Sequence, residues 1–276
     1  DDRLFGGDGN DTIVGGDGRD HLNGENGDDI LDGSQGEAST QGPGDLIRPG
    51  LGNDTIFGHE VHFENGGEGA VLSYADISGI GGIEIIVTDE VTGAGTVQSI
   101  SGEVINDTFQ YVRFFQGSAD GDIIRGGTVM QTGFAGLRGN DILYGGSSSY
   151  DFLQYYDDHY EDGGDGAVTV NFTTGTAIDG FGDTDTFYNM EQVRGTPFDD
   201  VFIGSSENER MFGMEGADSL SGEGGDDRLF GGDGNDTIVG GDGDDGLEIS
   251  ADCDRCRFQS LTHCTSPTAH PLLKPT

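Results

Sequence analysis

The sequence predicts an all-β fold, a parallel solenoid in which short strands alternate with tight turns. Glycine- and aspartate-rich units recur with a period of nine: GGDGNDTIV at 6–14, GGDGRDHLN at 15–23 and GENGDDILD at 24–32. Alternating runs such as IEIIV (83–87) and AVTVNF (167–172) favour strands, and no apolar stripe keeps a helical spacing over three turns.

The nine-residue period returns later in the chain. Residues 195–248 hold it through six consecutive units, among them GGDGNDTIV from Gly231 and GGDGDDGLE from Gly240. Isolated units begin at Pro49 (PGLGNDTIF), Gly117 (GSADGDIIR) and Gly136 (GLRGNDILY). Such a run in register indicates stacked, structurally equivalent units.

Each position of the unit has a chemical interpretation. Glycines at positions 1, 2 and 4 permit a positive φ and a turn that aims carbonyl oxygens inward. The aspartate at position 6 adds a carboxylate to those oxygens. Positions 7 to 9 form a short strand whose middle residue points to the interior. The predicted interior residues are Leu4, Ile13, Leu22, Leu31, Met211, Leu220, Leu229, Ile238 and Leu247.

The charge of the chain indicates which partners it can have. Acidic residues number 52 against 12 basic ones, and the formal charge is -40, which excludes nucleic acid because phosphate would be repelled. With Lys274 as the only lysine, the chain cannot neutralise its own carboxylates, so dissolved cations must do so. Ca²⁺ suits carboxylate and carbonyl ligands best. No apolar run reaches the ~18 residues of a membrane span.

The pattern GGxGxDxUx, with U a large apolar residue, resembles the RTX or haemolysin-type calcium-binding repeat. The resemblance implies a right-handed parallel β-roll in which two units form one 18-residue coil. It also implies that turns one coil apart share a calcium ion, so Asp11 would face Asp29, Asp218 would face Asp236, and Asp227 would face Asp245. Several ions would be bound. The metal ligands expected from it are Gly7, Gly9, Asp11, Gly16, Gly18, Asp20, Gly27, Asp29, Asp54, Asp122, Asp141, Asp200, Gly216, Asp218, Gly225, Asp227, Gly232, Gly234, Asp236, Gly241, Gly243 and Asp245. For the calcium-free chain, a disordered Gly/Asp-rich linker is the expected state.

Two stretches leave the period and resemble each other. LSYAD from Leu72 matches LQYYD from Leu153, and DTFQ from Asp107 matches DTFY from Asp185. They resemble the inserts of RTX proteins such as the serralysin C-terminal region, and we expect wider coils or a small sandwich that continues the roll. The expected organisation is a β-roll at 1–57, a β-rich insert at 58–116, degenerate turns at 117–146, a second insert at 147–194, a β-roll at 195–248 and a disordered tail at 249–276.

No catalytic site is predicted. His59, Glu60 and His62 form HExH, whose spacing is one residue short of the HExxH motif that places two histidines on one helical face. The acidic run at 157–162 lacks an apolar pocket, so we interpret it as a solvated loop, with a weak extra calcium as the alternative. In the tail, Cys253, Cys256, His263 and Cys264 could mimic a zinc knuckle, but the loop between the ligand pairs is very short. All three cysteines lie in this tail, so disulfides do not hold the body together.

The predicted function is that of a calcium-binding module of a secreted bacterial exoprotein, exported by type I secretion and folding outside the cell. The chain begins within a repeat, which suggests further domains upstream and downstream. One alternative is the C-terminal module of a secreted hydrolase such as a serralysin-type metalloprotease. Another is an adhesin segment, because residues 1–18 are identical to 226–243; that identity indicates either a duplication or an error of sequence assembly.

Overall fold

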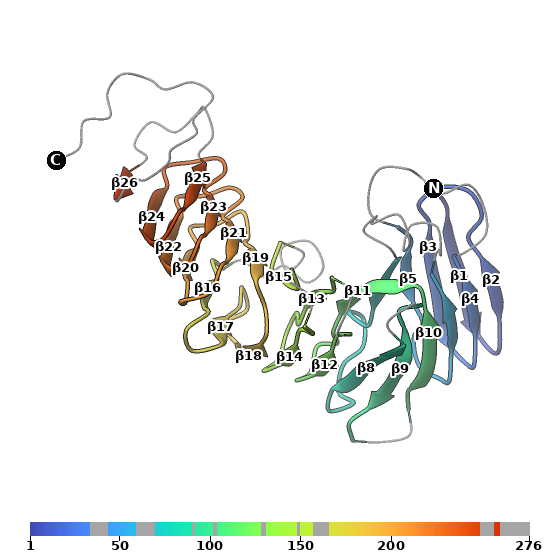
Figure 1. The fold of residues 1–276 in the computed structure, drawn as a ribbon. Coiled ribbons are helices and arrows are strands. Elements are labelled where there is room, and N and C mark those ends of the chain that lie inside the picture. The colour runs from blue at the N-terminus through green and yellow to red at the C-terminus, as the bar shows by residue number, and fades with distance from the viewer. Residues whose placement is uncertain are drawn as a thin grey trace.

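The computed structural model describes residues 1–33, 44–58, 70–89, 92–101, 104–127, 131–147, 150–156, 166–248 and 257–259. These residues form strands and turns and no helix, so none of them builds a helix that could cross a membrane. The strands belong to two sheets that run along the chain from its N-terminal coils to its C-terminal coils (Figure 1). The all-β parallel fold predicted from the repeats is therefore confirmed.

One sheet has 11 strands, and all its neighbouring strands are parallel. In sheet order they are β1 (Arg3–Asp8), β3 (His21–Asn26), β5 (Leu46–Arg48), β7 (Ala70–Ser73), β11 (Val112–Gln116), β13 (Gly133–Ala135), β15 (Phe152–Gln154), β19 (Gln192–Arg194), β21 (Arg210–Phe212), β23 (Arg228–Phe230) and β25 (Gly246–Glu248).

The other sheet has 15 strands and contains all the antiparallel pairs. In sheet order they are β2 (Thr12–Val14), β4 (Ile30–Asp32), β6 (Thr55–Phe57), β10 (Asn106–Gln110), β9 (Ala94–Ser99), β8 (Ile83–Asp89), β12 (Ile123–Arg125), β14 (Ile142–Tyr144), β18 (Thr184–Tyr188), β17 (Thr176–Ile178), β16 (Thr169–Asn171), β20 (Val201–Ile203), β22 (Ser219–Gly224), β24 (Thr237–Asp242) and β26 (Arg257–Gln259).

The repeats form coils of 18 residues, as the resemblance implied. Leu4 pairs with Leu22 in one sheet, and Ile13 pairs with Leu31 in the other. Successive nine-residue units therefore alternate between the two sheets. Equivalent residues of neighbouring coils stand side by side, which places every turn directly on the turn one coil away.

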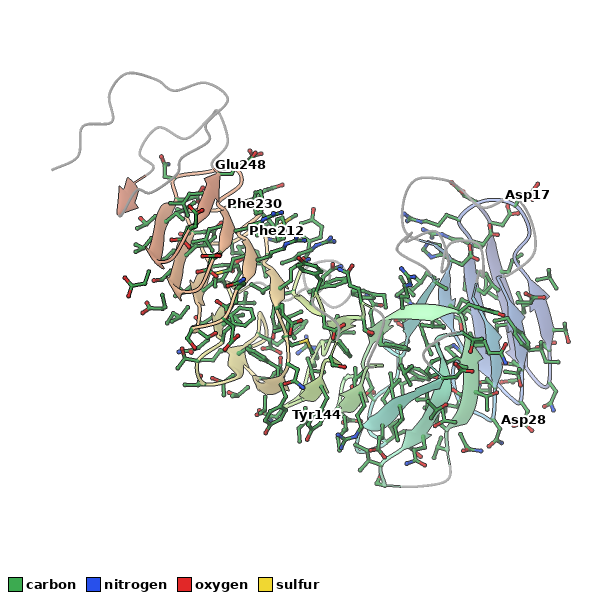
Figure 2. The ribbon with its side chains drawn as sticks, viewed as in Figure 1. Asp17, Asp28, Tyr144, Phe212, Phe230 and Glu248 are labelled. Carbon is green, nitrogen blue, oxygen red and sulfur yellow. The ribbon has the colours of Figure 1, made fainter. Side chains whose placement is uncertain are left out.

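The core is a single row of apolar side chains between the sheets. Each three-residue strand of a repeat buries its middle residue and leaves its flanking residues at least partly exposed, as in β23, where Leu229 is 0% exposed. Of the predicted interior residues, Leu4 is only half-buried, and the others are buried. On the outer side of the 11-stranded sheet, the rings of Phe212 and Phe230 stack 4.6 Å apart (Figure 2).

The two stretches outside the period each contribute an antiparallel meander to the 15-stranded sheet. The first, β8–β9–β10, lies between β6 and β12, and the second, β16–β17–β18, lies between β14 and β20. In both cases the three strands enter the sheet in reverse order. These inserts therefore widen one sheet of the roll and do not form a separate sandwich.

Candidate metal centre

The position-6 aspartates form ladders along the edges of the roll. Where two regular turns stack, the aspartate of one accepts, through Oδ1, a hydrogen bond from the backbone N–H of the equivalent residue in the neighbouring coil. The N–H of Asp11 donates to Asp29 over 2.8 Å, that of Asp218 to Asp236 over 3.0 Å, and that of Asp227 to Asp245 over 3.1 Å. The three aspartate pairs expected from the resemblance are thus brought together; whether they share an ion stays a prediction.

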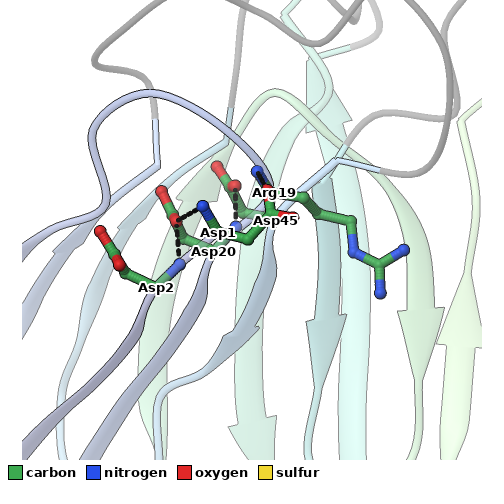
Figure 3. A network of polar contacts seen from close by, with 5 residues as sticks. All are labelled: Asp1, Asp2, Arg19, Asp20 and Asp45. Atoms are coloured by element: carbon green, nitrogen blue, oxygen red, sulfur yellow. Dashed lines mark hydrogen bonds and ion pairs between the residues drawn. The ribbon is translucent and has the colours of Figure 1, made fainter.

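The turns at the N-terminal end show the same ladder at close range (Figure 3). The backbone N–H of Asp2 donates to Oδ1 of Asp20 over 2.7 Å, and the N–H of Asp20 donates to Oδ1 of Asp45 over 2.8 Å. The guanidinium of Arg19 points away from these carboxylates, and only the Arg19 backbone N–H bonds to Asp1. The ladder is therefore held by backbone donors and not by basic side chains.

The second carboxylate oxygen of most ladder aspartates has no hydrogen-bond partner although it is buried. A buried, unsatisfied carboxylate oxygen is costly, and a hard cation is the partner that its charge and chemistry fit. The residues present therefore fit a calcium ion. The ladder aspartates with such an Oδ2 are Asp11, Asp20, Asp29, Asp54, Asp141, Asp218, Asp227 and Asp236.

Burial changes the acidity of these groups. Desolvation raises the pKa of the Asp54 and Asp227 carboxyls to about 7 and that of Asp218 to about 8. Neighbouring carboxylates add to the effect, since Asp200 and Asp236 both raise the pKa of Asp218. In the absence of a cation, these sites would therefore hold protons near neutral pH.

The glycines at positions 2 and 4 shape the turn as expected. Gly232 and Gly234 have φ values of 96° and 136°, in the region that favours glycine. The same holds for every other glycine predicted as a ligand. Those glycines are Gly7, Gly9, Gly16, Gly18, Gly27, Gly216, Gly225, Gly241 and Gly243.

The glycine at position 1 has a different role from the one we predicted. Gly231 does not adopt a positive φ. A Cβ at this position would instead lie 2.3 Å from Oδ2 of Asp236, and one at Gly213 would lie 2.1 Å from Oδ2 of Asp218. Position 1 is therefore glycine because the carboxylate of its own unit packs against it, not because the backbone turns there.

Carboxylates alone do not complete a metal site. Among the described residues, no three or more His, Cys, Asp or Glu side chains gather as they would around a metal. An ion at these turns would need backbone carbonyls for its remaining ligands. The stacking places backbone carbonyls of one turn against the glycines of the next. For example, a Cβ on Gly234 would lie only 1.7 Å from the carbonyl oxygen of Gly216, one coil away.

Two predicted ligands differ from the rest. Oδ2 of Asp122 accepts from the backbone N–H of Ser118 over 2.5 Å, and Oδ2 of Asp200 accepts from that of Thr196 over 2.7 Å. Their Oδ1 atoms are also hydrogen-bonded. Asp122 and Asp200 stand in the ladder as expected, but both of their carboxylate oxygens have protein partners.

The ladders also include residues that sequence reasoning missed. Asp107 accepts from the N–H of Asp54 and Asp185 from that of Asp141, so both insert aspartates continue the position-6 row. A signal was present, since NDTFQ from Asn106 repeats the NDTIV of the regular units. Glu209 takes the aspartate's place at position 6 of the unit 204–212. Further members without a regular unit around them are Asp45, Asp151 and Glu191.

Three groups singled out in the sequence lie outside the described residues. They are the HExH motif at 59–62, the acidic run at 157–162, and the set of Cys253, Cys256, His263 and Cys264.

Comparison with known families identifies one match. The family described as RTX calcium-binding nonapeptide repeat matches the chain in four copies, at residues 1–37, 134–149, 190–220 and 212–247. The first and the last two copies cover the regular turns described above. No curated protein matches the chain.

Proposed function

We propose, for a chain that carries RTX calcium-binding nonapeptide repeats, a role as a calcium-dependent folding module of a secreted protein. The observation that carries the proposal is the row of buried aspartate Oδ2 atoms without a hydrogen-bond partner, which includes those of Asp218, Asp227 and Asp236 in successive turns. The proposal assigns the chain a binding role and no catalytic one.

Coordination would change the balance of forces in the fold. In the calcium-free chain, the carboxylates of Asp218 and Asp236 repel each other, and this repulsion adds to burial in raising the pKa of Asp218. A divalent ion between stacked turns would turn this repulsion into attraction. The backbone turns and the thin core would then be stabilised together, because an ion that binds only the folded state shifts the equilibrium by mass action.

The same linkage suggests where the protein would fold. Calcium is scarce in the cytosol and abundant outside the cell, so the chain would stay extended before export and fold after it. Type I secretion and an extracellular location are parts of this proposal. Further domains upstream or downstream of the chain would supply any activity of the whole protein.

Single substitutions in one turn test the proposal. Asp236→Ala removes a buried carboxylate from the ladder, whereas Asp233→Ala removes an exposed carboxylate at the variable third position of the same turn. We expect Asp236→Ala to lower calcium affinity and to raise the calcium concentration needed for folding. Asp233→Ala should change both much less, because its contacts with the neighbouring coil are made by its backbone. Calcium titrations followed by circular dichroism measure both quantities.

Asp236→Asn is the matched control for this experiment, because its side-chain oxygen can still accept the bond from the N–H of Asp218. It should behave like the alanine variant if charge on the carboxylate is what matters. Equal effects of Asp233→Ala and Asp236→Ala would mean that bulk charge controls folding, and coordination would be ruled out.

A further inference from the structure

Some ladder carboxylates have hydrogen-bond donors from the protein on both of their oxygens. In the turn that begins at Gly195, the backbone N–H of Thr196 donates to Oδ2 of Asp200 over 2.7 Å, and its hydroxyl donates to Oδ1 over 2.8 Å. Ser118 makes the same two contacts with Asp122, over 2.5 and 2.8 Å. Each carboxylate therefore receives an N–H and an O–H from the second residue of its own turn.

The second position of the turn separates two classes. Where the Oδ2 has no partner and position 2 is described, that residue has a positive φ, even when it is not glycine: 81° at Met214, 67° at Glu223 and 67° at Leu137. The backbones of Ser118 and Thr196, by contrast, do not adopt a positive φ. Ser205, at the same position, directs its N–H and hydroxyl to the carboxylate of Glu209.

Tyrosines play the same part in the two inserts. The hydroxyl of Tyr74 donates to Oδ2 of Asp107 over 2.5 Å, and the hydroxyl of Tyr155 donates to Oδ2 of Asp185 over 3.3 Å. Both tyrosines lie in the matching sequences LSYAD and LQYYD and are buried. In both inserts, a buried tyrosine hydroxyl thus donates to the Oδ2 of the ladder aspartate.

The hydroxyl-capped aspartates stand where the ladder meets a meander. Asp107 lies in β10, the outer strand of the first meander next to β6, and Asp122 precedes β12 on the other side of that meander. Likewise, Asp185 lies in β18, next to β14, and Asp200 precedes β20.

On the meander side, each of these four aspartates has an apolar neighbour. Asp107 pairs with Val97, and Asp185 pairs with Ala177. The backbone N–H groups that donate to Asp122 and Asp200 belong to Ile83 and Val168. The residue in register on that side therefore carries no second carboxylate in any of the four cases. The Asp179 carboxylate, which does raise the pKa of Asp185, comes instead from the turn between β17 and β18.

A capped carboxylate is a poor cation ligand. Its oxygens already accept hydrogen atoms that carry partial positive charge, and a calcium ion would have to displace those donors. An Oδ2 that has no hydrogen-bond donor and lies next to a second carboxylate is, in contrast, a good cation ligand. The structure therefore gives a physical reason for two kinds of turn in one roll.

We propose that the hydroxyls of Tyr74, Ser118, Tyr155 and Thr196 close the calcium ladders at both sides of each meander, so that Asp107, Asp122, Asp185 and Asp200 bind no calcium. Calcium is taken only by turns whose second residue has a left-handed backbone. This inference rests on the calcium-binding role proposed above and specifies which aspartates serve it. It removes Asp122 and Asp200 from the set of ligands expected from the repeat pattern.

Adjacent rungs of one ladder provide a matched test. Asp200 and Asp218 are each 1% exposed, and each accepts a backbone N–H through Oδ1. We compare Asp200→Asn and Asp218→Asn in the full 276-residue chain by counting bound calcium ions with native mass spectrometry at saturating calcium. Asp200→Asn should bind as many ions as the unmodified chain, and Asp218→Asn should bind fewer.

A loss of ions in Asp200→Asn as large as that in Asp218→Asn would overturn the inference and leave the calcium-binding role intact. An unmodified chain that binds no calcium would overturn the proposed function itself. Should Asp200→Asn fail to fold, Thr196→Val and Thr196→Ser decide the question. The valine variant should bind the full number of ions but need more calcium to fold than the serine variant, which keeps the hydroxyl. Equal calcium requirements for the two would refute the role of the hydroxyl.

Discussion

Replacing Gly232 by alanine tests how tightly neighbouring turns are stacked. A Cβ on Gly232 would lie 1.9 Å from the carbonyl oxygen of Met214, one coil away, at a φ of 96°. Gly7 offers a control in an identical repeat, GGDGNDTIV, with a φ of 99°. No described residue lies within 4 Å of a Cβ placed on Gly7.

The expected cost follows from these two environments. Both substitutions place a Cβ in the left-handed region, which costs about 1–2 kcal/mol. At Gly232 the coils must also move apart, because real Cβ contacts under 3.0 Å essentially do not occur. That movement breaks the 2.7 Å hydrogen bond from the N–H of Asp233 to the Met214 carbonyl, a loss of about 0.5–1.5 kcal/mol. We therefore expect Gly232→Ala to lower the free energy of unfolding by about 1.5–3.5 kcal/mol, against about 1–2 kcal/mol for Gly7→Ala.

Denaturant unfolding of both variants in the 276-residue chain, at saturating calcium, measures the difference. The larger effect should appear at Gly232, together with a higher calcium requirement for folding. Equal destabilisation of the two variants would refute the reasoning, since it would show that the backbone conformation alone accounts for the cost.

Two more predictions follow from the buried charges and the thin core. Because burial raises the pKa of Asp54 and Asp227 from 3.8 to about 7 and that of Asp218 to about 8, the calcium-free fold binds more protons than the unfolded chain between about pH 4 and 8. The stability of the calcium-free fold should therefore be greatest below pH 4 and fall as the pH rises through 7 to 8. Circular dichroism in chelator measures this, and more β structure at pH 8 than at pH 5 would contradict the prediction. Leu229→Asp places a carboxylate between Met211 and Leu247, at a cost of several kcal/mol, and should prevent folding even in excess calcium. Ser219→Asp, on an exposed position of β22, is its control and should fold; a folded Leu229→Asp chain would disprove the single-row core.

The repeat period made much of this structure predictable. A spacing of nine residues fixes which side chains face inward, so Leu229 and Ile238 could be assigned to the core from the sequence. The facing of Asp218 and Asp236 followed from the resemblance, because the coil length is a property of the family and not of the spacing itself. Both features repeat along the chain with a fixed spacing, which makes them visible in the sequence.

The inserts were less predictable for a physical reason. Strands β8 and β16 could be recognised from alternation, but the reversed order of each meander in the sheet depends on pairing between segments far apart in the chain. The ladder role of Asp107 was hidden because the residues around it depart from the glycine pattern. Likewise, the packing of Asp236 against Gly231 requires knowledge of a side-chain rotamer that the sequence does not carry.

The roles of Ser118 and Thr196 show a further limit of motif reasoning. The position-6 aspartate is the same in both kinds of turn. The turns of Asp122 and Asp200 differ from those with a partnerless Oδ2 at position 4, where they lack glycine, and at position 2, four residues before the aspartate. A consensus that accepts any residue in place of the glycine at position 2 predicts a calcium ligand at Asp122 and Asp200. The hydrogen bonds to both carboxylate oxygens reveal the alternative.

The most direct test of the account is a calcium titration of the unmodified chain followed by far-ultraviolet circular dichroism at neutral pH. The partnerless carboxylate oxygens and the charge of -40 predict a spectrum of coil in chelator and of β structure in millimolar calcium. Magnesium at the same concentration should not replace calcium, because it demands near-octahedral geometry and dehydrates reluctantly. A fully folded spectrum in excess chelator, unchanged by added calcium, would contradict the account.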